Sequence, residues 1–276
     1  MKTQQSWIFE APPLSTIPPL LYAESPPPDS TLYVKIPLGG ESPAQPMTGI
    51  FIPQNYRIPS QIDLILYLHG HHKGGQFPTN LSIDKYWGSP NTYPFWSLRQ
   101  GLNAREKNVL LVAPTLGSGS EAGFLTSDPN GFDNYLDQVR AALIKYYAPY
   151  KKLNDPPQIG DIVLACHSGG GVRMQQIVMK PQKYTNNIRE CWGFDCLYGD
   201  TNLQSWIDWA KSRNAKLYIH YGNGGTAENS EQLKKMASDQ SVSNISVEGI
   251  ATLEHNRVPI THWRNRLRAA RFLLGR

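Results

Sequence analysis

Short apolar runs alternate with amphipathic stretches along most of the chain after residue 31. The runs DLILYL at 63–68 and DIVLAC at 161–166 are nearly continuous, which is typical of strands buried on both faces. Residues 133–147 instead place apolar side chains along one side at helical spacing. The pattern predicts strands at 32–36, 48–52, 63–68, 108–113, 161–166, 190–194, 216–221 and 245–250, and helices at 95–106, 133–147, 169–180, 203–212, 230–238 and 259–274.

This alternation of strands and helices predicts the α/β class, with an open, mostly parallel, doubly wound sheet and helices on both faces. The two strands predicted at 32–36 and 48–52 are close in sequence and should form an antiparallel pair at the start. Residues 1–30 carry three proline clusters, and proline is excluded from helix interiors and central strands. We therefore expect a proline-rich N-terminal arm at 1–30 and a single α/β domain at 31–276.

Composition and charge narrow the possible partners. Of the 276 residues, 40% are hydrophobic and 18% are charged, enough for a sizeable core. The net charge of +5 is mild, and no nucleic-acid-binding motif accompanies it, so we expect no nucleic-acid partner. No apolar run approaches the roughly 18–20 residues that span a bilayer, and the N-terminus lacks the apolar region of a secretory signal. These features predict a cytoplasmic protein without a membrane span, and leave its oligomeric state open.

The segment Cys166–Gly171, CHSGGG, lies directly between a predicted strand and a predicted helix. A nucleophile elbow has this context, with a serine on a strained turn and small residues two positions before and after it. Ser168 is therefore the candidate nucleophile, with Gly170 as one small neighbour and Cys166 where the G-x-S-x-G pattern has glycine. A phosphate-binding loop would need a different glycine spacing followed by a lysine, which is absent here.

Two further features occur in the order that such an elbow requires. The pair His69–Gly70 follows the predicted strand 63–68, and a late histidine precedes the last helix. Together with the elbow, they resemble the α/β-hydrolase superfamily, in particular serine esterases and lipases. The resemblance implies the fold, a Ser-acid-His triad, and an oxyanion hole formed by amides of Gly169 and of the Gly70–His71 region. It implies no cofactor.

The candidate acid is Asp195, which ends the predicted strand 190–194, at the edge where open α/β sheets bind ligands. Its position is similar to that of the acid in the pancreatic lipase group. Most superfamily members place the acid one strand later, where the following loop offers only Glu228. Glu228 and Asp200 remain alternatives.

Two histidines, His255 and His262, are candidates for the base. Pro259 favours the first turn of a helix, which places His255 in the preceding loop and His262 inside the helix. The superfamily base usually lies in such a loop, so we expect His255 to be the base and keep His262 as the alternative. His220, within a predicted strand, is expected to be a core residue with satisfied hydrogen bonds.

The residues thus predict a serine hydrolase that acts on a small-molecule acyl substrate through an acyl-enzyme, with a carboxylic ester as the default by analogy. One alternative is an inactive hydrolase-fold module that binds a partner. Another is a metal-dependent hydrolase using His69, His71 and His72. The H-G-H-H spacing lacks the shared helix face of H-E-x-x-H zinc sites, so we predict no metal there.

Overall fold

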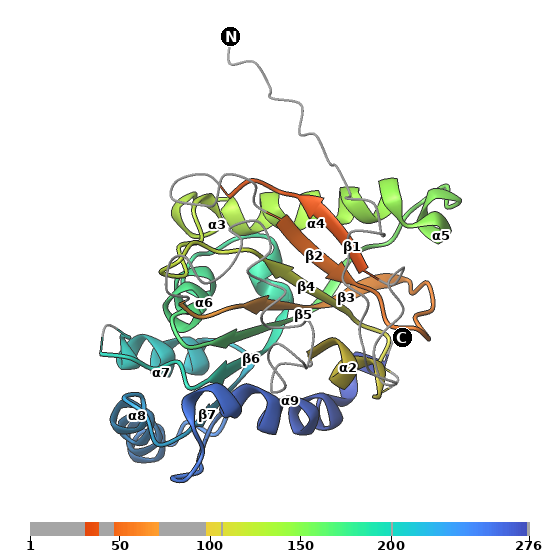
Figure 1. Cartoon of the computed structure of the whole chain (residues 1–276). Coiled ribbons are helices and arrows are strands. Elements are labelled where there is room, and N and C mark those ends of the chain that lie inside the picture. Colours follow the sequence, from red (N-terminus) through yellow and green to blue (C-terminus); the bar gives the residue numbers. More distant parts are fainter. Residues whose placement is uncertain (1–30, 39–46, 72–97, 106, 200, 275–276) are drawn as a thin grey trace.

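The computed structural model describes residues 31–38, 47–71, 98–105, 107–199 and 201–274. The proline-rich segment 1–30 lies outside these residues. In the described part, eight strands form one sheet in the order β1-β2-β4-β3-β5-β6-β7-β8 (Figure 1). The strands are β1 (Thr31–Lys35), β2 (Met47–Phe51), β3 (Gln61–Leu68), β4 (Leu110–Pro114), β5 (Gln158–His167), β6 (Ile188–Phe194), β7 (Lys216–Tyr221) and β8 (Ile245–Gly249).

The sheet is parallel except at its beginning. β1 pairs antiparallel with β2, and β2 pairs antiparallel with β4, while β4, β3, β5, β6, β7 and β8 run parallel to one another. The predicted fold class, including the antiparallel pair at the start, is confirmed. The carboxyl ends of β3, β5, β6 and β7 therefore meet at one edge, where ligands bind in open α/β sheets.

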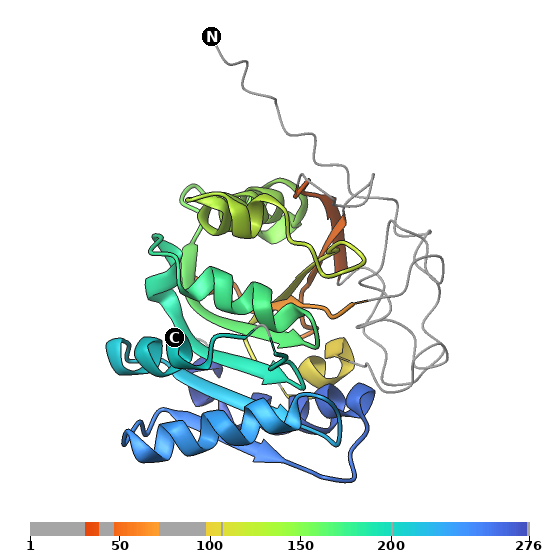
Figure 2. The same cartoon turned by 90° about the vertical axis from the view of Figure 1, so that its left-hand side faces the viewer.

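Helices cover both faces of the sheet. The α-helices are α2 (Leu98–Asn103), α3 (Phe124–Ser127), α4 (Gly131–Tyr146), α5 (Ala148–Lys151), α6 (Gly170–Val178), α7 (Leu203–Ser212), α8 (Ala227–Asp239) and α9 (Val258–Ala269), and the 3₁₀ helices are η3 (Tyr184–Asn187), η4 (His255–Arg257) and η5 (Arg271–Leu274). Side chains of α4, α6, α7 and α8 belong to the larger apolar cluster, and those of α2 and α9 to the smaller one. Helices α2 and α9 lie side by side in both views (Figure 1, Figure 2).

A fully buried tryptophan fixes α9 against the sheet. The Trp263 ring packs edge-on against Tyr67 of β3 and against Trp192 and Phe194 of β6. Its indole nitrogen donates a hydrogen bond to the carbonyl of Leu98 in α2 at 3.0 Å. Because η4 leads directly into α9, this anchor also positions His255.

The larger differences from the sequence-based prediction concern helices. The last helix was expected to reach residue 274, but α9 ends at Ala269 and a 3₁₀ turn follows. The side chain of Lys107 donates to the Ala270 carbonyl at 3.0 Å, so a tertiary contact accompanies the helix end. Helices α3 and α5 were not predicted, because four residues are too few to show a helical period.

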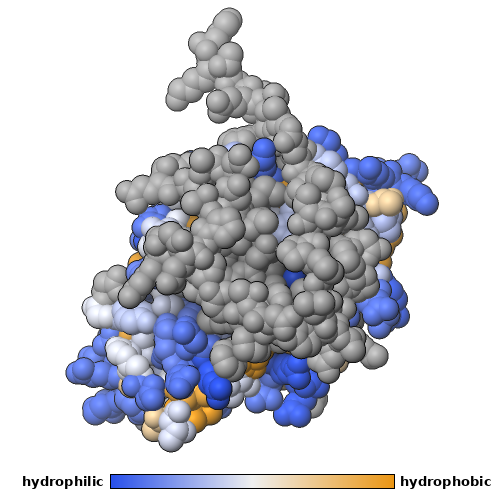
Figure 3. Space-filling model, viewed as in Figure 1, coloured by the Kyte–Doolittle hydropathy of each residue, from blue (hydrophilic) through white to orange (hydrophobic). Residues whose placement is uncertain are grey.

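Among the described helices, none is long and apolar enough to cross a membrane. The described surface seen in Figure 3 is largely hydrophilic, with hydrophobic residues in small areas. Large hydrophobic side chains that are exposed in the described part are Ile58, Met179 and Ile250. Isolated residues of this kind are normal on protein surfaces.

Candidate active site

Ser168 follows the last residue of β5 and precedes α6. Its φ is 53°, in the left-handed region that residues other than glycine seldom adopt. Its amide donates to the carbonyl of Phe194 at the end of β6, 3.1 Å away, which holds the turn in place. A strained residue that its surroundings fix in this way is typical of functional sites.

The small residues around the turn are required by close backbone contacts. A Cβ at Gly170 would overlap the Leu68 carbonyl, and a Cβ at Gly70 would lie 2.5 Å from the Cβ of Ser168. Both contacts would be far closer than van der Waals distance, so both positions need glycine. Cys166 is buried within β5 and its thiol contacts that of Cys196, so this departure from glycine is accommodated.

Asp195 lies directly after β6, fully buried, with a φ of 48°. Its amide donates to the His220 carbonyl at 2.7 Å. The Oδ1 atom accepts hydrogen bonds from the Gly222 amide at 3.2 Å and from the Thr226 hydroxyl. The Oδ2 atom is 2.5 Å from Nδ1 of His255. Burial alone would raise the pKa of Asp195, but the hydrogen bonds from His255, Thr226 and Gly222 more than offset burial and hold this pKa below its usual range.

His255 is the first residue of η4, and its side chain is 34% exposed. An ionised carboxylate can only accept, so Nδ1 of His255 carries a proton in the contact with Asp195, and in the neutral form of the ring Nε2 has the lone pair. The ring packs against that of His167, with centroids 4.4 Å apart. His167 also donates from Nε2 to the His255 carbonyl at 3.3 Å. The residue before Ser168 thus positions His255.

Tyr198 contacts both Ser168 and His255, and it was not predicted as a site residue from the sequence. Its hydroxyl and Ser168 Oγ are 3.3 Å apart and share a hydrogen bond. Its ring lies edge-on to His255, with centroids 6.5 Å apart. The side-chain amide of Asn229 in α8 donates a hydrogen bond to the Tyr198 carbonyl oxygen at 2.7 Å. The only signal in the sequence is an aromatic residue three positions after the candidate acid.

The turn after β3 lies against the nucleophile. The Leu116 amide donates to Nε2 of His69 at 2.8 Å, so Nδ1 carries the proton and donates to the Gly70 carbonyl, also at 2.8 Å. His69 therefore fixes the plane of the peptide between Gly70 and His71. The ring of His71 lies so close to Gly169 that a Cβ there would overlap it. Gly70, His71 and Gly169 thus surround Ser168 from two loops.

The alternatives from the sequence have other surroundings. His262 is buried in α9, with its ring stacked on that of His220 rather than on His255. Glu228 is exposed in the first turn of α8, and Thr226 at the cap of that helix is the residue that contacts Asp195. Asp200 lies outside the described residues.

The alternative metal cluster of His69, His71 and His72 has little support. Both ring nitrogens of His69 already take part in the hydrogen bonds that shape the turn. His72 lies outside the described residues. A metal at His69 would need to displace one of these hydrogen bonds.

Solved structures resemble this fold at low sequence identity. An S-formylglutathione hydrolase from Agrobacterium tumefaciens aligns with a TM-score of 0.52 and 11% identity, covering 89% of this chain and 96% of the other. The feruloyl esterase module from Clostridium thermocellum, in complex with sinapinate, aligns with a TM-score of 0.54 and 14% identity, covering 95% and 96%. A ferulic acid esterase aligns at 0.51 and 13%, covering 88% and 97%.

No protein-family model matches the sequence, and the search of curated proteins finds no significant match. At 11–14% identity, the structural similarity shows the fold alone. These three structures are a hydrolase and two esterases, and they share the α/β-hydrolase fold. The chain therefore has the α/β-hydrolase fold.

Proposed function

We propose that this protein is a serine hydrolase that cleaves carboxylic esters, with Ser168 as nucleophile, His255 as base and Asp195 as acid. The observation that carries the proposal is the contact of 2.5 Å between the buried carboxylate of Asp195 and His255, whose ring packs against the residue before a serine held at a φ of 53°. Both features belong to the sheet edge where β5 and β6 end. A purely structural turn after β5 would not require a histidine held by a buried carboxylate next to it.

The chemistry follows from the tautomer of His255. Its Nε2 lone pair accepts the Ser168 proton as Oγ attacks the ester carbonyl, and Asp195 stabilises the resulting imidazolium. The imidazolium then protonates the leaving alcohol, and an acyl-enzyme remains. His255 next takes a proton from water as the water attacks the acyl group. The bond from the acyl carbon to Ser168 Oγ then breaks, the imidazolium returns the proton to Oγ, and the acid is released. No cofactor takes part in these steps.

The developing oxyanion needs preorganised donors. We assign these to the amides of Gly169, at the N-terminal cap of α6, and of His71, in the peptide that His69 orients. The N-terminus of α6 adds a favourable helix dipole for negative charge. A small-molecule ester is the expected substrate class, by analogy with the esterases of similar fold.

Hydrolysis of a panel of p-nitrophenyl esters tests this proposal. Wild-type protein should turn over at least one ester, and Ser168→Ala should lose activity by about 10³-fold or more while it keeps its melting temperature. Ser238→Ala, an exposed serine in α8, is the matched control and should behave as wild type. A folded Ser168→Ala variant that retained most of the activity would overturn the assignment.

The two rival functions give different results in the same assay. An inactive binding module would hydrolyse none of the esters. A metal-dependent hydrolase using His69, His71 and His72 would lose activity after exhaustive treatment with a chelator. The serine mechanism predicts that activity survives this treatment.

A further inference from the structure

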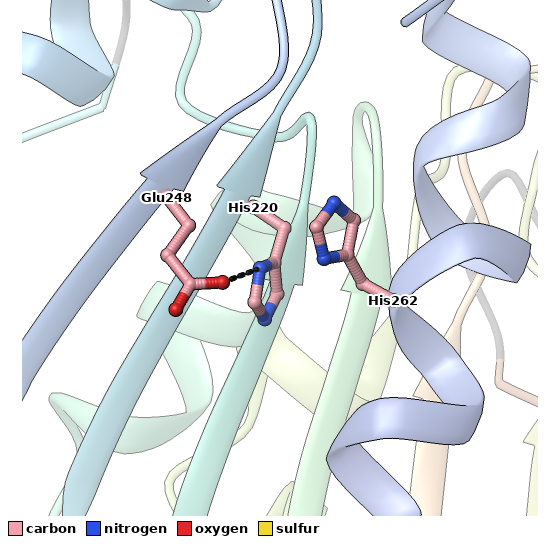
Figure 4. Close-up of side chains that lie close together, drawn as sticks. All are labelled: His220, Glu248 and His262. Atoms are coloured by element: carbon pink, nitrogen blue, oxygen red, sulfur yellow. Dashed lines mark ion pairs between the residues drawn. The ribbon is translucent and has the colours of Figure 1, made fainter.

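A second group of ionisable side chains lies on the α9 face of the sheet, apart from the Ser168 site. It consists of His220 in β7, Glu248 in β8 and His262 in α9 (Figure 4). His220 and Glu248 are register partners in parallel strands, so their side chains point to the same face. Figure 4 shows His220 between Glu248 and His262. One potential ligand atom from each residue lies within 4.8 Å of the other two.

The two imidazoles are buried, and three of their four ring nitrogens lack a hydrogen-bond partner among the described residues. His220 is 4% exposed and His262 is 6% exposed. Neither nitrogen of His220 has a hydrogen-bond partner among the described residues, and the same holds for Nε2 of His262. Nδ1 of His220 is 3.4 Å from the Glu248 carboxylate, without the alignment of a hydrogen bond. Buried polar atoms of this kind are rare and call for an explanation.

Burial disfavours the charged form of both rings. Burial, together with the nearby His262 and Arg266, lowers the pKa of His220 to about 3. Burial also lowers the pKa of His262. The charge of Arg266 is itself balanced by Glu190 of β6 at 2.7 Å.

We propose that His220, Glu248 and His262 bind a divalent transition-metal ion of the zinc type. Two imidazoles and one carboxylate are a ligand set that zinc uses, with water at the remaining position. Zinc–ligand bonds of about 2.0–2.2 Å bring the ligand atoms closer together than they lie in the structure. The rings are stacked 4.1 Å apart and 18° from parallel, so one ring must tilt to direct its lone pair at the shared ion. The side chain of Glu248 is 64% exposed, so it can change its conformation to reach the ion. It also faces the solvent from which the ion enters.

The bound ion would connect β7, β8 and α9. The His220 carbonyl accepts the Asp195 amide at 2.7 Å, and His262 lies in the helix that directly follows His255. We therefore assign the ion a stabilising role, outside the hydrolytic reaction. No step of ester cleavage uses the ion, so a negative result for zinc binding would leave the proposed hydrolase activity untouched, and the reverse also holds.

Zinc binding to the full chain tests the inference directly. Chelator-stripped protein is titrated with Zn²⁺ in competition with a chromophoric chelator, and Co²⁺ is used in parallel for its visible spectrum. We expect one ion per chain, the absorption of a low-coordinate Co²⁺ site, and a higher melting temperature with Zn²⁺. Mg²⁺ should produce none of these effects, because it prefers oxygen ligands.

Three variants separate a specific site from adventitious binding. Glu248→Gln replaces an exposed side chain, so the fold should be kept. It should weaken zinc binding by about ten-fold or more, because the loss of a hydrogen bond to a metal ligand already costs that much in other proteins. His262→Gln should abolish the Co²⁺ spectrum. Glu228→Gln, an exposed glutamate in α8, should bind zinc as wild type does. Failure of wild-type protein to bind zinc, or equal binding by wild type and Glu248→Gln, would overturn the proposal.

Discussion

Replacement of Asp195 by asparagine should stop the reaction without disturbing the fold. The asparagine carbonyl oxygen can still accept from Thr226 and Gly222, so the buried position stays satisfied. The amide group then faces Nδ1 of His255 as a donor, where the carboxylate was an acceptor. The imidazole must turn to the other tautomer, with its proton on Nε2, and cannot take the proton of Ser168. The imidazolium also loses its counter-charge.

The magnitude is the loss that a neutralised acid causes in other triads, about 10⁴-fold in kcat, or about 5 kcal/mol in the activation free energy. The assay compares kcat for the best p-nitrophenyl ester at pH 7, with melting temperature as the folding control. Glu228→Gln serves as the matched acidic control and should change kcat little. Near-normal turnover by folded Asp195→Asn, together with a collapse in Glu228→Gln, would move the acid to the loop after β7 and refute the assignment.

Three further predictions concern other residues. His255→Ala should lose as much activity as the nucleophile variant, whereas His262→Ala should keep at least about a tenth of wild-type kcat, a cost of about 1.4 kcal/mol or less; the reverse result would make His262 the base. Gly170→Ala should destabilise the fold by about 1–3 kcal/mol in urea unfolding, because its Cβ would overlap the Leu68 carbonyl, and unchanged stability would contradict the packing described. In chelator-treated protein, the pKa of His220 is about 3 in the folded state, so unfolding takes up a proton between about pH 6.5 and pH 3. The free energy of unfolding should therefore fall as the pH drops through this range, by up to about 1.4 kcal/mol per pH unit. His220→Phe should reduce the slope of this free energy against pH, and an equal slope would show that His220 is not the group responsible.

The sequence predicted the sheet well because its apolar runs are long and uninterrupted. The helix at 203–212 and the strand at 216–221 have the predicted bounds, and the other strands shift by a few residues at their ends. The order β1-β2-β4-β3 could not be read from these patterns, because it depends on which strands pair across the molecule. The end of α9 at Ala269 likewise coincides with a contact from Lys107, far away in sequence.

In the candidate site, too, local features could be predicted from the sequence, and contacts between distant segments could not. The local signals for Ser168, Asp195 and His255 were each visible as a residue type at an element boundary, and the structure brings Asp195 and His255 into contact. Tyr198 was missed because nothing in its neighbours marks it. His220 was expected to be a core residue with satisfied hydrogen bonds, and this was wrong: its ring nitrogens have no hydrogen-bond partner among the residues described. Only the packing of α9 against β7 reveals this.

Labelling with a fluorophosphonate probe tests the central claim most directly. Such a probe reacts covalently with a serine only when a base activates it. Wild-type protein, stripped of metal by a chelator, should be labelled once, and peptide mapping by mass spectrometry should place the label on Ser168. His255→Ala should be labelled far more slowly. A folded wild-type protein that remains unlabelled, or a label on another serine, would contradict the account.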